Sequence, residues 1–124
     1  MTSTESIIET LLNILQSKAY DYIDEKRCQD QMEEHFSELG IGFIREFRLD
    51  EHSRIDFFFP NSGIGLEVKA GKSWSRMKVY RQVERYTKSP DIRGVILATG
   101  RAQTLPALIN DKPIRLHCLG AAHL

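Results

Sequence analysis

The segment from Arg54 to Gly71, RIDFFFPNSGIGLEVKAG, constrains the fold of this chain more than any other. Two apolar stretches flank the turn residues PNSG, which predicts a β-hairpin with strands over 54–59 and 64–70. The first strand is apolar on both faces and yet carries Asp56, a costly place for a carboxylate that lacks a partner. Strands of this kind are covered by helices on both sides, so we expect a layered α/β domain.

The remaining segments supply the helices and the other strands of such a domain. Apolar residues at helical spacing predict helices over 4–18, 24–39 and 74–88, and a weak helical turn near 105–109. Period-two or continuous apolar runs predict strands over 43–49, 94–99 and about 113–119. The strand over 94–99 follows a helix, which favours parallel pairing with its neighbour. We therefore expect one domain over residues 1–124, with a catalytic core at about 24–99.

Glu67 and Lys69 lie two residues apart on the returning strand of the hairpin, opposite a wholly apolar face. The turn can bring Asp56 close to Glu67, and two carboxylates repel each other unless a cation lies between them. Mg²⁺ would satisfy both, together with the backbone carbonyl of Val68 and water. Lys69 would then lie beside a metal-activated water, the equipment for hydrolysing a phosphodiester. The alternative is a cross-strand salt bridge on a solvated sheet face.

This hairpin resembles the hallmark of the PD-(D/E)XK nuclease superfamily, in which an Asp on one strand is followed by E-x-K on the next. The core of that superfamily is an αβββαβ arrangement, the restriction-endonuclease-like fold, which matches the predicted order of residues 24–99. The resemblance implies that Asp56 and Glu67 bind Mg²⁺ or Mn²⁺ and that Lys69 is catalytic. The proline of the family motif is replaced by Ile55.

Two further motifs bear on the branch of the superfamily. Gln82 and Tyr86 form Q-x-x-x-Y, similar to RecB-like and Holliday-junction-resolvase-like members, which implies that Gln82 supports the active site and that Tyr86 approaches DNA. Many relatives also carry an acid on the helix before the first strand, but counting back from Gly40 and Arg45 places Gln29 there. The candidate positions for an additional acid are therefore left open: Glu25, Gln29, Glu33 and Glu46.

The formal net charge is zero, yet the charges are unevenly distributed. Residues 1–42 hold three basic and nine acidic residues, whereas residues 69–101 hold nine basic and two acidic ones. The basic stretch begins at Lys69, so we expect DNA to approach the third helix. The predicted contacts are Lys72, Lys78, Arg81, Arg85 and Tyr86. Trp74 and Tyr80 either stack on unpaired bases or pack into the core.

The cysteines and the N-terminal segment indicate where the protein resides. Cys28 and Cys118 are far apart and form no C-x-x-C motif, so we expect two reduced core thiols. The apolar stretch from Ile7 to Leu15 is interrupted by polar residues and follows no basic leader, which argues against a signal peptide or a membrane span. We expect a soluble cytoplasmic protein that does not bind membranes.

The sequence thus predicts a metal-dependent endo- or exodeoxyribonuclease. One alternative is a catalytically inactive nucleic-acid-binding or assembly module with the same fold, and another is an α/β domain in which the hairpin charges are structural. The length leaves little beyond a catalytic core, so a homodimer or a subunit of a larger DNA-processing assembly, in repair, phage or defence, would each fit. The form of DNA that is cut stays open.

Overall fold

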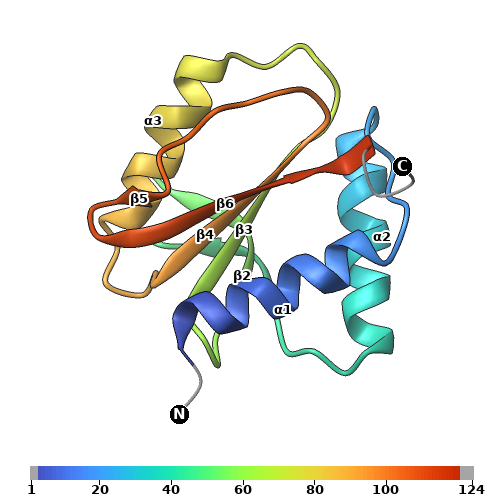
Figure 1. The fold of residues 1–124 in the computed structure, drawn as a ribbon, viewed down its shortest axis with the longest axis horizontal. Helices are drawn as coiled ribbons and strands as arrows, with labels where there is room; N and C mark the ends of the chain where they lie inside the picture. The colour runs from blue at the N-terminus through green and yellow to red at the C-terminus, as the bar shows by residue number, and fades with distance from the viewer. Residues whose placement is uncertain (1–2, 121–124) are drawn as a thin grey trace.

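The computed structural model describes residues 3–120, which form a mixed sheet between helices (Figure 1). The helices are α1 (Thr4–Gln16), α2 (Glu25–Glu38) and α3 (Arg76–Thr87), and the strands are β1 (Ile44–Arg48), β2 (Arg54–Phe59), β3 (Ile64–Lys69), β4 (Gly94–Thr99), β5 (Leu108–Ile109) and β6 (Lys112–Cys118). The sheet order is β1-β2-β3-β4-β6-β5. The β1-β2-β3 pairs are antiparallel and β3-β4-β6 are parallel. The predicted α/β class and the parallel β3–β4 pair are confirmed.

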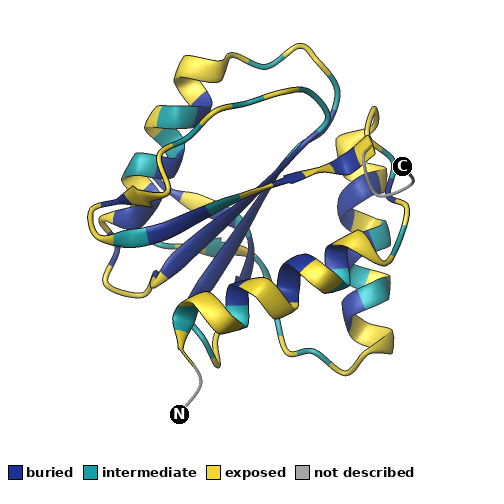
Figure 2. Cartoon of the chain, viewed as in Figure 1, coloured by how far each residue is buried: buried dark blue, intermediate teal, exposed yellow. Residues whose placement is uncertain are grey.

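Each face of the sheet is covered by its own helical layer. One core cluster joins α1 and α2 to Phe57, Phe59 and the inward face of β3, and a second cluster joins α3 to Ile55, Phe58 and β4. The two central strands β3 and β4 are therefore buried on both sides, as Figure 2 shows in dark blue. The acidic helices α1 and α2 lie on one face and the basic helix α3 on the other (Figure 1).

The strands β1 and β2 both change face at the level of Asp56. Phe57 packs with α2, whereas Ile55, two residues earlier, packs with α3, although a regular strand would place both on one face. In β1 the residue at this level is Glu46, whose φ of 52° is left-handed. Such a residue interrupts the regular alternation, as in a β-bulge. Residue 55 therefore lies on the opposite face from residues 57 and 59, which a regular period-two strand would place together with it.

Most predicted boundaries are met within one or two residues, and the start of α3 and the segment 105–109 differ for identifiable reasons. Helix α3 begins at Arg76 with Ser75 as its cap, because Trp74 is held in the preceding loop by a hydrogen bond from its Nε1 to the Gly71 carbonyl. Residues 108–109 form the short strand β5 rather than part of a helical turn. Asn110 and Asp111, with φ of 52° and 63°, make the two-residue turn that pairs β5 with β6.

The cysteines and α1 complete the comparison. Cys28 is buried as predicted, but Cys118 is exposed, because the alternation along β6 turns its neighbours His117 and Leu119 inward instead. The apolar side of α1 packs on the sheet. Within residues 3–120, no helix combines the length and the apolar character needed to cross a membrane.

Gly100 holds the loop before α2 against the carboxyl ends of β3 and β4. A Cβ at this position would lie 2.5 Å from the Tyr22 carbonyl oxygen and 2.9 Å from the Gly71 nitrogen, and both are backbone atoms that cannot move aside alone. We therefore expect Gly100→Ala to lower the free energy of unfolding by about 1–3 kcal/mol. Urea unfolding checks this, with Gly42→Ala as the control because a Cβ at Gly42 meets nothing within 4 Å.

Candidate active site

Asp56 and Glu67 lie at the point where β2 and β3 separate. The ladder between the strands runs to the pair Phe57–Leu66, and beyond it side chains replace the backbone pairing. The Asp56 N–H donates to Glu67 Oε1 at 3.2 Å, and the Val68 N–H donates to Asp56 Oδ2 at 2.8 Å. Lys69 Nζ lies 3.3 Å from Glu67 Oε2. The structure therefore brings together the three charged residues singled out in the hairpin.

Burial raises the proton affinity of both carboxylates. Glu67 is only 2% exposed, and its pKa is raised to about 8, first by burial and then by the charge of Asp56, against the opposing effect of Lys69. Burial also raises the pKa of Asp56, opposed by the hydrogen bond from Val68 and by Lys69. One lysine thus faces two desolvated carboxylates, and a further cation would lower the free energy of their ionised forms.

A cleft of about 620 Å³ opens beside Asp56, between α2 and β1. Every position considered for an additional acid lines it together with Asp56: Glu25, Gln29, Glu33 and Glu46. Sequence reasoning could not choose among these positions, because three lie on one helix and the fourth on a strand. The structure gathers all four at the carboxylate that the hairpin presents.

Glu25 is the one of these residues whose charge interacts most directly with the hairpin. Its pKa is raised by burial and by the charge of Asp56, and lowered by Lys69 and by a hydrogen bond from the backbone of Ala70. Gln29 and Glu33 are engaged by Arg45 instead, at 2.7 Å for Gln29 Oε1 and 3.8 Å for the Glu33 carboxylate.

Arg45 is a cleft residue that sequence reasoning did not assign to the site, as are Lys26 and Asp30. Its guanidinium also donates to Asp30 at 3.1 Å and lies over the Phe57 ring, 5.3 Å from the centroid. The arginine therefore joins α2 to β1 across the floor of the cleft, and its charge lowers the pKa of Asp56. The signal available in the sequence was a basic residue at the same period-two positions as the apolar residues Phe43 and Phe47, in a strand that follows an acidic helix.

Gln82 and Tyr86 form a hydrogen-bonded pair beneath the hairpin. Gln82 Nε2 donates to the Tyr86 hydroxyl at 2.7 Å, and that hydroxyl donates to the Arg54 carbonyl at 3.0 Å. Burial and the neighbouring charge of Glu67 raise the pKa of Tyr86, so its hydroxyl stays protonated. Tyr86 has no exposed surface, which corrects its predicted contact with DNA. The pair instead anchors α3 to β2 one residue before Ile55.

The remaining predicted DNA contacts are exposed. Lys72 lies in the loop before α3, and Lys78, Arg81 and Arg85 lie on the helix itself. On the described surface of α3 the only carboxylate is the half-buried Glu84, so the outer face of the helix carries positive charge. Positively charged helix faces bind phosphates, and this one adjoins the hairpin through Gln82.

Comparisons with known proteins identify no relative. No protein-family model, no curated protein and no solved structure matches this chain. What the site does is therefore inferred from its own residues.

The chemistry of these residues suits a hard divalent cation, because the donors at the cleft are carboxylate oxygens with backbone carbonyls nearby. Within residues 3–120, however, no three carboxylate, histidine or cysteine side chains already converge on one point. Lys69 lies against Glu67 in this arrangement. A cation at Asp56 would therefore require Glu25 or Glu67 to turn toward it.

Proposed function

We propose that this chain is a divalent-metal-dependent nuclease that hydrolyses DNA phosphodiesters, with the fold and hairpin of the PD-(D/E)XK superfamily. The observation that carries the proposal is the pair of desolvated carboxylates, Asp56 and Glu67, linked through the hairpin backbone with Lys69 on the same strand. Buried carboxylates with raised pKa values and a lysine partner, beside an open cleft, are typical of catalytic sites.

Asp56, Glu67 and the Val68 carbonyl would hold Mg²⁺ or Mn²⁺, with Glu25 as the additional acid. A bound ion of this kind supplies water of lowered pKa and neutralises charge on the phosphate. Glu25 is chosen because its carboxyl interacts with both Asp56 and Lys69, whereas Arg45 engages Glu33. Glu46 lines the same cleft and stays a weaker candidate.

Lys69 orients the attacking water and stabilises the negative charge that develops on the phosphate. Its ammonium lies at the end of β3 and is partly exposed, so a substrate phosphate can reach it while Glu67 holds it in place. Gln82 acts through Tyr86, which fixes the position of β2 next to Asp56. The DNA backbone is guided to this site by exposed basic side chains: Lys72, Lys78, Arg81 and Arg85.

Cleavage of DNA by the purified protein tests the proposal. With Mg²⁺ or Mn²⁺ we expect cutting of at least one member of a panel of linear duplex, single-stranded, flapped and four-way-junction DNA, and none with EDTA. Separation on denaturing gels distinguishes internal from terminal cutting. If no member of the panel is cut with either ion, the nuclease assignment is wrong.

A second candidate function, binding of nucleic acid without catalysis, is favoured by one observation. The three site carboxylates do not converge in the described structure, and Lys69 Nζ already lies 3.3 Å from Glu67 Oε2. Titration calorimetry with Mn²⁺ separates the two functions, because a nuclease should bind the ion through Asp56 and lose that binding in Asp56→Asn. A binding module would give no heat that depends on Asp56.

A further inference from the structure

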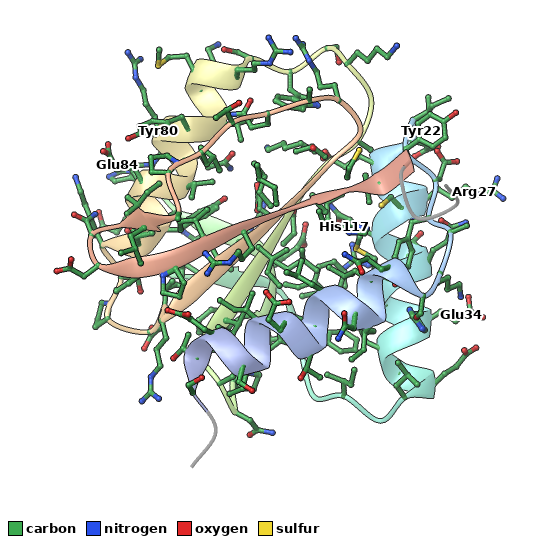
Figure 3. All side chains as sticks on the ribbon, viewed as in Figure 1. Tyr22, Arg27, Glu34, Tyr80, Glu84 and His117 are labelled. Carbon is green, nitrogen blue, oxygen red and sulfur yellow. The ribbon has the colours of Figure 1, made fainter. Side chains whose placement is uncertain are left out.

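A second concave region lies between the start of α3 and the loop after β4. It has a volume of about 540 Å³ and is lined by Arg76, Met77, Tyr80, Ala102, Gln103 and Thr104. Tyr80 and Gln82 are separated by about 200° around the helix axis. Gln82 faces β2, so this pocket and the candidate active site lie on opposite flanks of α3; Figure 3 labels Tyr80 there.

Hydrogen bonds fix the walls of this pocket. Arg76 Nε donates to the Ala102 carbonyl at 3.0 Å, and Gln103 Nε2 donates to the Arg76 carbonyl at 3.4 Å. Arg101 donates to the Lys72 carbonyl at 3.0 Å and lies over the Trp74 ring. The helix and the loop are thus joined at several points, and the pocket is preformed.

The lining of the pocket suits a flat heterocycle. Tyr80 presents a partly exposed ring, and Met77 is 59% exposed although it lies on a regular helix. An aromatic face and a thioether together offer a surface on which one planar ligand can stack.

The charges around the pocket select the class of ligand. Arg76 lines the pocket, and other exposed or half-exposed basic residues lie on the same helix and in the adjoining loops: Lys72, Lys78, Arg81 and Arg101. Aromatic residues interleaved with basic ones bind unpaired nucleic acid, because bases stack on the rings while phosphates meet the cations. Binding of a protein partner or of a neutral metabolite would not require these positive charges.

We infer that the pocket receives one unpaired base of a nucleic-acid strand, stacked on the Tyr80 ring beside Met77. The inference rests on the proposed function, since it names an unpaired strand as the substrate of that site. The strand would pass from the cleft beside Asp56 around the edge of the sheet and over the basic outer face of α3. Bases within an intact duplex are paired and stacked, so they cannot enter the pocket.

Fluorescence of 2-aminopurine tests the inference without cleavage. The base is placed at each position in turn of a single-stranded oligonucleotide and titrated with the protein in Ca²⁺. We expect the emission to change at one position of the bound strand, and Tyr80→Ala to abolish that change and weaken single-strand binding about 5- to 100-fold. Tyr80→Phe should restore both, and binding of a blunt duplex should not depend on Tyr80.

A second variant guards against misfolding, because Tyr80 also packs against the core. Ala102→Trp fills the pocket from its exposed loop and should weaken single-strand binding as Tyr80→Ala does. Tyr22→Ala removes a 49% exposed tyrosine near α2, at another corner of the molecule, and should have no effect (Figure 3). Unchanged single-strand binding in Ala102→Trp, or an equal loss in Tyr22→Ala, would overturn the inference.

The two proposals fail in different ways. If Tyr80→Ala and Ala102→Trp leave the cutting of DNA unchanged, the inferred base pocket is wrong and the nuclease proposal stands. If the protein cuts no DNA but the 2-aminopurine response depends on Tyr80, the nuclease proposal is wrong and the inferred base pocket stands.

Discussion

Asp56→Asn is expected to reduce metal-dependent DNA cleavage by on the order of a thousandfold or more while the protein stays folded. The amide keeps an oxygen that can accept the Val68 N–H, so the junction of β2 and β3 is preserved. What is lost is the negative charge at the cleft. Lys69→Met should reduce cleavage comparably, because methionine keeps most of the aliphatic length and removes the ammonium. Initial rates under saturating Mg²⁺ measure both effects.

The matched control is Lys72→Met, three residues further along. Lys72 is exposed and lies outside the carboxylate pair, so we expect its loss to weaken DNA binding modestly and to leave the maximal rate unchanged. Circular dichroism and thermal unfolding establish that each variant is folded. Full activity in both Asp56→Asn and Lys69→Met would exclude the proposed site.

Glu67→Gln is expected to stabilise the metal-free protein at alkaline pH. The pKa of Glu67 is about 8 in the folded chain against an ordinary value of 4.5, so between these values the folded state holds a proton that the unfolded state has released. The free energy of unfolding contributed by this group therefore falls as the pH rises from about 4.5 to 8 and is constant outside that window. At pH 9 the variant should be more stable by up to roughly 5 kcal/mol.

Urea unfolding in EDTA across pH 4–9 measures this difference. Below pH 4.5 the variant and the parent should have similar stabilities, because Glu67 of the parent is then protonated in both the folded and the unfolded chain. Glu51→Gln, at a side chain that is 94% exposed, should run parallel to the parent chain. A constant difference between Glu67→Gln and the parent at every pH would show that Glu67 ionises normally in the fold.

The sequence was sufficient for the hairpin and for most of the sheet because those segments carry strong local signals. The strands 54–59 and 94–99 were predicted with the bounds that the structure has, since apolar runs end at clear turn residues. Asp56, Glu67 and Lys69 come together because a short turn leaves the two strands little choice of pairing. Local pattern alone fixes this part of the site.

The parts that could not be predicted depend on contacts between distant segments. The face of Ile55 follows from the left-handed backbone of Glu46 in a neighbouring strand, which no alternation pattern reveals. The burial of Tyr86 depends on the Arg54 carbonyl, far away in sequence. Arg45 reaches α2 only because β1 lies at the edge of the sheet beside that helix.

The packing of α1 on β6 closes the hydrophobic layer beneath the site with residues that are distant in sequence. Ile8 of α1 shares a core cluster with Leu119, just after β6, so elements from opposite ends of the described chain close one hydrophobic layer. Such a long-range closure costs loop entropy before its contacts form, which slows folding. The same cluster contains Phe57 and Val68, the neighbours of Asp56 and Glu67. The hydrophobic layer that covers the backbone next to the carboxylate pair is therefore complete only when elements from both ends of the described chain have packed together.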